Sequence, residues 1–306
     1  MLVYEANLLR GYQLTWLDRS GREIGKVGNV QDQRHTSVSP DGRVAATVRR
    51  DQGIWLYDLL RGGEARFTSP PLIGTAPVWS PDGSRIAYGW GNTLYLKDAS
   101  GGVKEELLLA TGNEKTPSDW SRDGRYLIYT ETGPKGRGDI WFLPDPLNKS
   151  GDRKPIKFQG TDAMESQGQL APDDRWIAYV SKESGPSEVY VRPFPSGPGR
   201  WKVSGNQGQE PRWRRDGREL FYWENGSGDV RRLMAVPVQL GPDANFQAGV
   251  PQPLFEFHAI SATETVNHFL YSPTADGQRF LVNVQAGDAA TLNVITNWEK
   301  AALRNK

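Results

Sequence analysis

The stretch Trp79-Ser80-Pro81-Asp82-Gly83-Ser84 decides the fold, because close copies of it recur along the chain. Proline presets φ and glycine accepts a positive φ, so Pro-Asp-Gly between two apolar runs predicts a tight turn between strands. The other copies are Val38–Arg43, Trp120–Arg125, Leu170–Arg175, Trp213–Arg218 and the stretched Tyr271–Gly277. The fold therefore rests on a repeat.

The spacing of the copies indicates the size of the repeating unit. The first aspartate of each copy stands at position 41, 82, 123, 173, 216 or 276, and a period of about 40–45 residues is typical of four-stranded propeller blades. Each copy leads into an apolar strand, a polar gap and a second strand, such as Val44–Val48 followed by Ile54–Tyr57. No long helical pattern competes with these strands. The sequence therefore predicts an all-β protein, a β-propeller of four-stranded antiparallel blades.

The number of blades depends on the strands outside the turn motifs. Six turn copies give blades that start near residues 35, 75, 116, 166, 208 and 266. Three further strands are expected at Met1–Ala6, Gln13–Asp18 and Glu23–Val27. These strands favour a seventh blade that starts near residue 1, within a single propeller domain over residues 1–306. A six-bladed ring, in which the terminal strands share one closing blade, is the alternative.

Tryptophan recurs at one position of the repeat, as Trp79, Trp120 and Trp213. Both faces of the expected strands are rich in aromatic and aliphatic residues, whereas an isolated antiparallel sheet leaves one face in water. Blades that pack face to face around a ring bury both faces. We therefore expect these tryptophans to pack between blades rather than to stack on a ligand.

Composition excludes several classes of function. Thirty-seven Lys and Arg against 36 Asp and Glu give a net charge of +1, which argues against a nucleic-acid partner, because such proteins are usually strongly basic. The absence of cysteine excludes disulfides, thiolate nucleophiles and cysteine metal sites. No apolar run approaches the roughly 18 residues of a membrane span. We expect a monomer, and the residues leave the compartment unknown, since Met1–Gly11 lacks the order of a signal peptide.

The sequence holds no recognisable catalytic motif. Neither a kinase nucleotide loop and catalytic loop nor the Gly-x-Ser-x-Gly of serine hydrolases is present. The three histidines are too scattered for a metal signature. We therefore expect no cofactor and no metal, and favour a non-catalytic module. A propeller enzyme of the lyase or lactonase type, with its site at the channel mouth, is the alternative.

The loops that lead into the innermost strands are expected to gather on one face around the central channel. They contribute polar and charged residues that do not follow the repeat. These candidate binding residues are Arg34, His35, Lys115, Glu165, Glu210 and His268. A pocket of this kind suits a protein, a peptide or another small-molecule ligand.

Several motifs carry a family resemblance. They include Asp51–Asp58, Glu188–Pro195, Trp201–Ser204 and Asp276–Leu281, and the run Val-Tyr-Val-Arg-Pro-Phe-Pro ending at Pro195 is the most specific of them. In these motifs the chain resembles the WD40-like PD40 propellers of TolB-type proteins. It resembles most the C-terminal propeller region of acidobacterial-type serine/threonine protein kinases. The resemblance implies a sensor part of a kinase-linked receptor in an extracytoplasmic, periplasmic position, with a TolB-like envelope scaffold as a further alternative.

Overall fold

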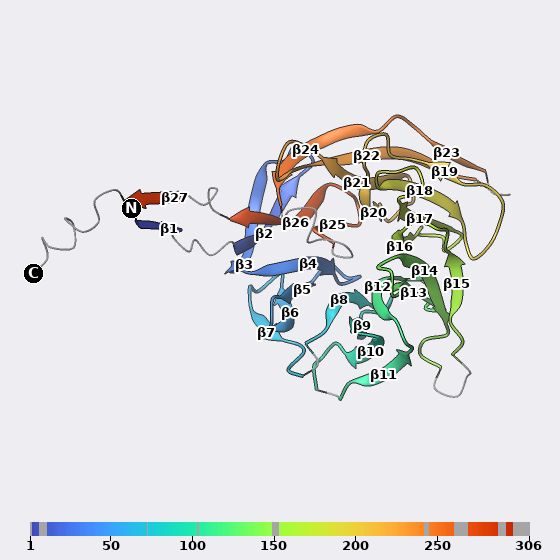
Figure 1. Cartoon of the computed structure of the whole chain (residues 1–306), viewed down its shortest axis with the longest axis horizontal. Coiled ribbons are helices and arrows are strands. Elements are labelled where there is room, and N and C mark those ends of the chain that lie inside the picture. Colours follow the sequence, from blue (N-terminus) through green and yellow to red (C-terminus); the bar gives the residue numbers. More distant parts are fainter. Residues whose placement is uncertain are drawn as a thin grey trace, which may run out of the picture.

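The computed structural model of the chain describes residues 2–5, 11–71, 73–102, 104–148, 153–241, 245–259, 269–286 and 292–295. Six antiparallel sheets are arranged radially around one axis and form a closed ring (Figure 1). Each sheet is one blade, and its innermost strand lies next to the axis. The predicted all-β propeller of four-stranded blades is confirmed.

The blades are numbered here in chain order of their innermost strands. Blade 1 is β4 (Gln33–Val38), β5 (Val44–Arg49), β6 (Gly53–Asp58) and β7 (Glu64–Arg66), and blade 2 is β8 (Thr75–Trp79), β9 (Arg85–Trp90), β10 (Thr93–Asp98) and β11 (Glu106–Ala110). Blade 3 is β12 (Glu114–Trp120), β13 (Tyr126–Thr132), β14 (Gly138–Pro144) and β15 (Ile156–Gln159), and blade 4 is β16 (Glu165–Leu170), β17 (Trp176–Ser181), β18 (Glu188–Pro193) and β19 (Trp201–Lys202). Blade 5 is β20 (Gln209–Trp213), β21 (Glu219–Asn225), β22 (Val230–Leu240) and β23 (Phe246–Ala248), with β24 (Gln252–His258) also paired to β22. Blade 6 is β25 (Tyr271–Pro273), β26 (Arg279–Ala286), β2 (Gly11–Asp18) and β3 (Glu23–Gln31).

Blade 6 corrects the predicted number of blades from seven to six. Strands β2 and β3 do not begin a blade of their own, because β2 pairs along its whole length with β26, from Gly11 opposite Ala286 to Asp18 opposite Arg279. The first predicted strand is observed as β1 (Leu2–Glu5), which pairs with β27 (Leu292–Ile295) in a separate two-stranded sheet. The six-bladed alternative, with terminal strands shared in one closing blade, is therefore the observed arrangement.

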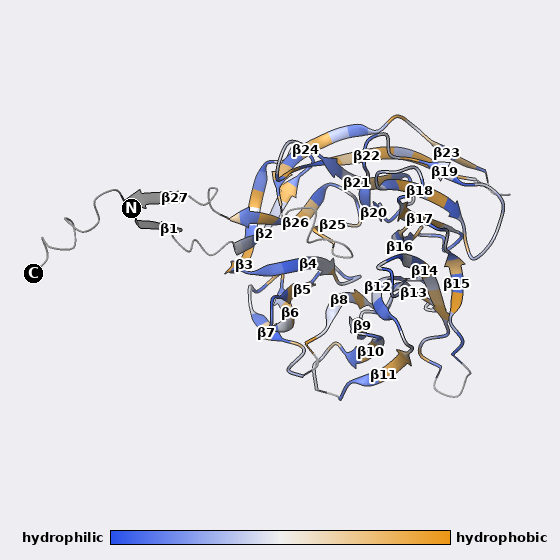
Figure 2. Cartoon of the chain, viewed as in Figure 1, coloured by the Kyte–Doolittle hydropathy of each residue, from blue (hydrophilic) through white to orange (hydrophobic). Residues whose placement is uncertain are grey.

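The core is divided among the six contacts between neighbouring blades. Each of six clusters of buried apolar side chains joins two adjacent blades. Trp176, Tyr222 and Phe246, for example, are buried between blades 4 and 5. Leu14 and Tyr57 are buried between blades 6 and 1, where the ring closes. Figure 2 shows hydrophobic segments spread all round the ring rather than gathered on one side.

The recurring tryptophans take part in these contacts between blades. The Trp79 indole N–H donates to the Ser37 carbonyl at 3.1 Å, and that of Trp213 donates to the Gln169 carbonyl at 3.0 Å, in each case in the preceding blade. Trp120 is buried in the cluster between blades 2 and 3. The packing role predicted for these residues is confirmed.

The Pro-Asp-Gly turns hold together through their aspartates. In blade 1, Ser39 Oγ donates to Asp41 Oδ1 at 2.6 Å, and the same oxygen accepts the Arg43 N–H at 3.1 Å. Gly42 has a φ of 75°, which a side chain would disfavour. The serine- or threonine-to-aspartate bond recurs in blades 2, 3 and 6. Each aspartate thus serves its own turn.

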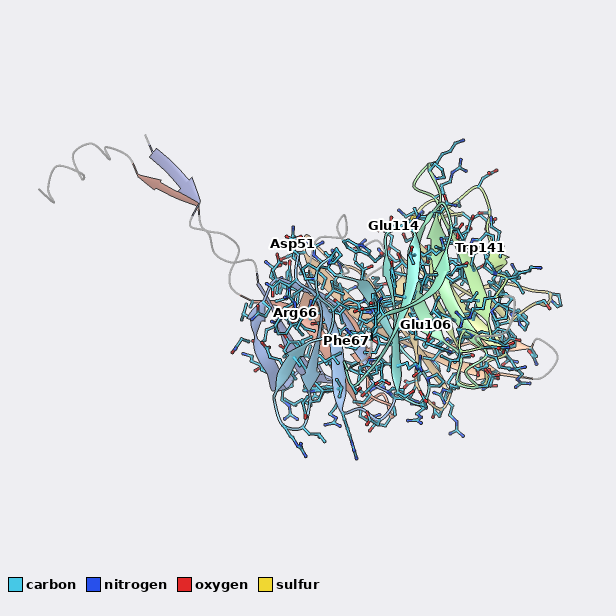
Figure 3. All side chains as sticks on the ribbon, turned by 90° about the horizontal axis from the view of Figure 1, so that it is seen from below. Asp51, Arg66, Phe67, Glu106, Glu114 and Trp141 are labelled. Carbon is cyan, nitrogen blue, oxygen red and sulfur yellow. The ribbon has the colours of Figure 1, made fainter. Side chains whose placement is uncertain are left out.

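The two faces of the ring carry different loops. In the edge-on view of Figure 3, Asp51 and Glu114 lie on the upper side, where the chain leads into the innermost strands. The Pro-Asp-Gly turns follow the opposite ends of these strands. We call the first face the loop face and the second the turn face.

Candidate binding site in the central channel

A cavity of about 770 Å³ lies at the centre of the ring, and turn residues of several blades, including Asp41, Asp174 and Asp276, form part of its lining. Every blade contributes the residue that stands two positions before the residue equivalent to Ser39 in its turn, which is Ser39, Ser80, Ser121, Ala171, Arg214 or Thr274. These channel residues are Ser37, Val78, Asp119, Gln169, Arg212 and Ser272. The six positions are equivalent in the repeat, so the propeller fold alone does not explain the differences among their side chains.

A β-bulge in the innermost strand directs side chains toward the channel. In blades 1, 2, 4 and 5 the bulge contains a non-glycine residue of positive φ, namely His35 (63°), Ala76 (48°), Gln167 (58°) and Glu210 (53°). Few residues adopt this conformation, and a bulge re-aims the side chains beside it. Because the same irregularity recurs in four blades, we regard it as the local device that positions the channel residues.

Blades 3, 4 and 5 present charged or amide side chains to the channel, which we call the polar wall: Asp119, Gln169 and Arg212. Arg212 Nη1 donates to Gln169 Oε1 at 2.7 Å, and Gln169 Nε2 donates to the Ser118 carbonyl. The Arg212 guanidinium carbon lies 3.7 Å from the centroid of the Phe269 ring, a cation–π contact. The other three blades present only serine or valine. At this position of the repeat, therefore, three consecutive blades carry polar side chains and the other three carry small ones.

Asp119 is the titratable group of the polar wall. Burial raises the pKa of its carboxyl to about 6, while the Leu170 N–H, which donates to Oδ2 at 2.6 Å, and the Arg212 charge lower it. The negative charge of Asp174 raises it further. The charge on this wall consequently changes between mildly acidic and neutral pH.

The turns of blades 3, 4 and 5 also depart from the repeat. Arg122 and Arg215, which we call the mouth arginines, replace the turn proline found as Pro40, Pro81 and Pro172 in blades 1, 2 and 4. They line the channel cavity together with Asp174. Burial and the positive charge of Arg215 lower the pKa of Arg122.

Asp174 takes the place of the turn glycine and has a φ of 55°. Its Oδ1 accepts the Arg122 N–H at 3.0 Å, and its Oδ2 accepts the Asp123 N–H at 3.1 Å. The carboxylate therefore ties the turn of blade 4 to the turn of blade 3. This bond fixes the backbone from which the Arg122 side chain extends.

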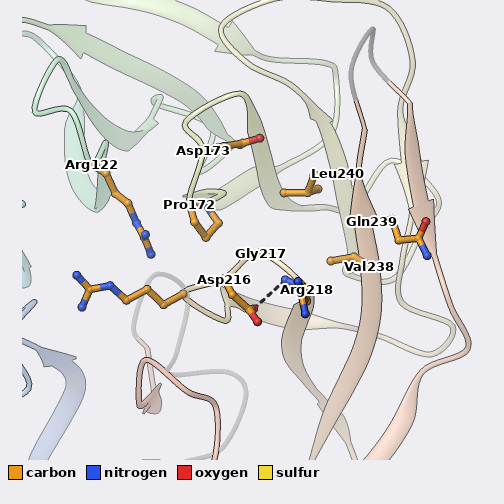
Figure 4. Close-up of a pocket in the computed structure, with 10 residues that line it drawn as sticks. Arg122, Pro172, Asp173, Asp216, Gly217, Arg218, Val238, Gln239 and Leu240 are labelled. Carbon is orange, nitrogen blue, oxygen red and sulfur yellow. Dashed lines mark hydrogen bonds between the residues drawn. The ribbon is translucent and has the colours of Figure 1, made fainter.

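A second cleft, of about 710 Å³, opens beside the channel between the turns of blades 3, 4 and 5. Figure 4 shows Arg122 directed toward it, and the dashed line marks the Arg218 N–H donating to Asp216 Oδ1 at 3.0 Å. Arg122, Pro172 and Arg215 line both cavities. The channel and the cleft thus meet at the mouth arginines.

Two of the residues predicted as binding residues are buried in contacts within their own blades. Lys115 Nζ lies 3.3 Å from Glu131 Oε2, its cross-strand neighbour on β13. Burial lowers the pKa of Lys115, and the Glu131 charge opposes that effect. Glu165 Oε1 accepts the Thr161 hydroxyl at 2.6 Å. Neither residue lines the two cavities.

The remaining predicted residues lie on or near the innermost strands. Glu210 is fully buried, and its Oε2 accepts the Leu270 N–H of the neighbouring blade at 2.6 Å. His35 lines the channel cavity, while Arg34 precedes it on β4 outside that lining. His268 lies outside the described residues. Among the five predicted residues that the structure describes, only His35 reaches the cavity, and a ligand-binding role for the set stays a prediction.

The polar wall and the mouth arginines were not among the predicted residues, although the repeat carries a signal for them. Aligned turn copies show arginine in place of proline at positions 122 and 215 and aspartate in place of glycine at 174. Two positions before the residue equivalent to Ser39 in each turn, charge appears at Asp119 and Arg212 alone. Departures from a repeat therefore mark this site.

The described ranges hold no group of three or more His, Asp or Glu side chains that could bind a metal ion. Within the same ranges, no helix is both long and apolar enough to cross a membrane.

Comparison with known proteins supports the fold. No family model matches the chain. The structure of a TolB protein from Agrobacterium tumefaciens is similar with a TM-score of 0.73 and 16% identity, over 91% of this chain and 99% of that one. TolB from Acinetobacter baumannii is similar with a TM-score of 0.58 and 18% identity, over 79% of this chain and 63% of that one.

A sequence relative is the uncharacterized peptidase YuxL of Bacillus subtilis, 26% identical over 179 residues. The match takes 53% of this chain and 26% of that protein, so this chain spans about a quarter of that relative's length. The resemblance to kinase-attached propellers stays a prediction. The predicted TolB-type resemblance is confirmed by the solved structures, and the chain has the fold of the TolB-type, WD40-like β-propellers.

Proposed function

We propose that this chain is a non-catalytic binding module that holds an extended peptide segment, free or part of a protein partner, in its central channel. The observation that carries the proposal is the polar wall. Three consecutive blades carry Asp119, Gln169 and Arg212 at the position where the other three blades carry serine or valine. A cavity of about 770 Å³ falls in the usual range of ligand sites, roughly 300–1,000 Å³.

The chemistry of the polar wall suits a peptide backbone, which offers carbonyl acceptors and N–H donors in alternation. Arg212 uses Nη1 for Gln169, and its Nη2 has no hydrogen-bond partner among the described residues. Asp119 adds a carboxylate acceptor in blade 3. The likeness to a protein named as a peptidase supports peptides as the ligand class.

The finer part of the proposal concerns the setting of the module. We propose that it works outside the cytoplasm as a monomer and reports ligand binding to a fused or separate kinase. The resemblance to kinase-attached propellers and the TolB-type fold support this setting. Fractionation of cells that produce the native protein tests it, since recovery in the cytoplasm would contradict it.

The binding function can be tested without knowing the natural ligand. A displayed library of random peptides is selected on the purified chain, and the dissociation constants of enriched peptides are measured by fluorescence anisotropy. Arg212→Met should weaken binding at least tenfold, because it removes the charged donors but keeps a long side chain over Phe269. Arg43→Met, on the exposed rim of the blade 1 turn, is the matched control and should leave binding unchanged.

Two results would overturn this function. One is a selection that yields no enriched peptide, and the other is a set of peptides that bind the Arg212 variant as tightly as the original chain. Mass spectrometry of the bound peptides after long incubation separates binding from turnover. Cleaved or rearranged peptides would replace the binding module by the alternative of a propeller enzyme.

A further inference from the structure

The mouth arginines occupy a position at which the turn favours another residue. Proline suits the second position of a tight turn because its ring presets φ. Blades 1, 2 and 4 keep that proline, whereas blades 3 and 5 carry Arg122 and Arg215. Arginine gives up this rigidity and brings a long cationic side chain to the turn face. The fold does not account for either arginine.

The two mouth arginines keep hydrogen-bond donors available at this place. Within the described residues, the Arg122 guanidinium makes no hydrogen bond or ion pair, and its backbone N–H is the group that donates to Asp174. Arg215 makes one long bond, from Nη1 to the Pro40 carbonyl at 3.3 Å. Both oxygens of Asp174 already accept backbone N–H groups. The Arg122 guanidinium and most donors of the Arg215 guanidinium are therefore open to a ligand.

The nearby carboxylate of Asp123 is also committed to its own turn. It accepts the Ser121 hydroxyl at 2.8 Å and the Arg125 N–H at 2.9 Å. Burial and the positive charge of Arg215 lower the pKa of Arg122, whereas the charges of Asp119 and Asp174 raise it. A ligand that brings negative charge between the two side chains relieves this repulsion.

The position of the pair also matters, because Arg122 and Arg215 line both the channel and the adjoining cleft. A segment that runs from the polar wall into the adjoining cleft therefore lies beside them. Guanidinium groups bind carboxylates through two parallel hydrogen bonds. Resting on the proposed function, we infer that the mouth arginines bind carboxylate groups of the ligand, which is therefore an acidic peptide segment.

Three labelled peptides test this site by fluorescence anisotropy at low salt. Acetyl-hexaglutamate amide carries side-chain carboxylates, acetyl-hexaglutamine acid carries one C-terminal carboxylate, and acetyl-hexaglutamine amide carries neither. We expect the first to bind at least tenfold more tightly than the last. Arg122→Gln and Arg215→Gln should each weaken hexaglutamate binding about tenfold, as expected for one charge-assisted contact. Raising the salt concentration should weaken binding as well.

Arg125→Gln is the matched control. Arg125 follows Arg122 in the same turn, pairs with Asp123 and lines neither cavity, so its variant should bind hexaglutamate within twofold of the original chain. Tighter binding of the C-terminal acid than of hexaglutamate would move the ligand class from acidic side chains to a chain terminus and overturn the inference as stated. So would equal losses in the Arg122, Arg215 and Arg125 variants.

The test separates this inference from the proposed function. Library peptides that depend on Arg212 but bind equally well to the Arg122 and Arg215 variants would leave the channel function standing and remove the carboxylate site. Loss of dependence on Arg212 as well would remove both.

Discussion

Replacing Glu210 by glutamine should make the protein more stable at neutral pH. The carboxyl group is fully buried near the contact of blades 5 and 6, where Oε2 accepts the Leu270 N–H at 2.6 Å. Burial raises its pKa to about 8, although the Leu270 N–H and the Arg212 charge act in the opposite direction. The folded protein therefore keeps the proton on Glu210 at pH 7, whereas a free glutamate ionises near pH 4.5.

The size of the effect follows from these two pKa values. The folded state holds a proton that the unfolded chain releases, so the stability contributed by Glu210 falls as the pH rises from about 4.5 to about 8. Since one pKa unit corresponds to about 1.4 kcal/mol, Glu210 should lower the free energy of unfolding by about 2 to 3 kcal/mol between pH 5 and pH 7. Glutamine has no proton to release, and its side-chain oxygen can still accept the Leu270 N–H.

Urea unfolding followed by tryptophan fluorescence at pH 5 and pH 7 measures this difference. Glu210→Gln should gain stability relative to the original chain as the pH rises. The control is Glu114→Gln on β12, where the side chain is exposed, and it should follow the original chain at both pH values. Parallel pH dependence in the Glu210 variant and the original chain would refute the assignment of a buried, protonated carboxyl group.

Three further predictions concern stability. Asp119→Asn should flatten the fall in unfolding free energy between pH 4 and pH 6, because burial raises the Asp119 pKa to about 6 and the folded form holds the proton to higher pH. An equal change of the urea midpoint in the variant and in the original chain across that range would contradict this. Trp213→Phe should lower the free energy of unfolding by about 1 kcal/mol, since the hydrogen bond from the indole N–H to the Gln169 carbonyl at 3.0 Å is lost. An unchanged melting temperature would argue against this contribution. Gly53→Ala should lower the free energy of unfolding by more than about 2 kcal/mol, since a Cβ there would lie 2.4 Å from a backbone oxygen at a φ of 86°. Gly42→Ala has open space around the new Cβ and should lower it by about 1 kcal/mol. Equal losses in the two variants would refute the steric argument.

The blades were predictable from the sequence because their turns are set by local chemistry. Ser39, Asp41 and Gly42 form their turn through contacts within six residues, and the same residues recur along the chain. The number of blades was not predictable in this way. Strand β2 has the same alternation of side chains whether it begins a new blade or pairs with β26, and that choice rests on a contact between distant parts of the chain.

The location of the candidate site was also only partly predictable from the sequence. The binding residues were predicted on the loop face, whereas turn residues contribute to the lining of the cavity. Glu210 illustrates the difficulty, because a charged residue near the axis can be buried against a neighbouring blade rather than face the channel. Asp119 and Arg212 could be recognised from the sequence as departures from the repeat. Only the structure, with its bulged innermost strands, shows that this position faces the axis.

The closing blade also has a consequence for how the chain folds. During synthesis, β2 and β3 leave the ribosome early, and β26 follows only after all other blades have been made. Contacts of such high contact order form slowly, so we expect the first five blades to assemble before the ring shuts. Until then β2 and β26 are unpaired edges, which readily recruit strands from other molecules. Two nascent copies could therefore exchange their β2–β3 hairpins and close each other's rings, giving a domain-swapped dimer from the same bonds that seal the monomer.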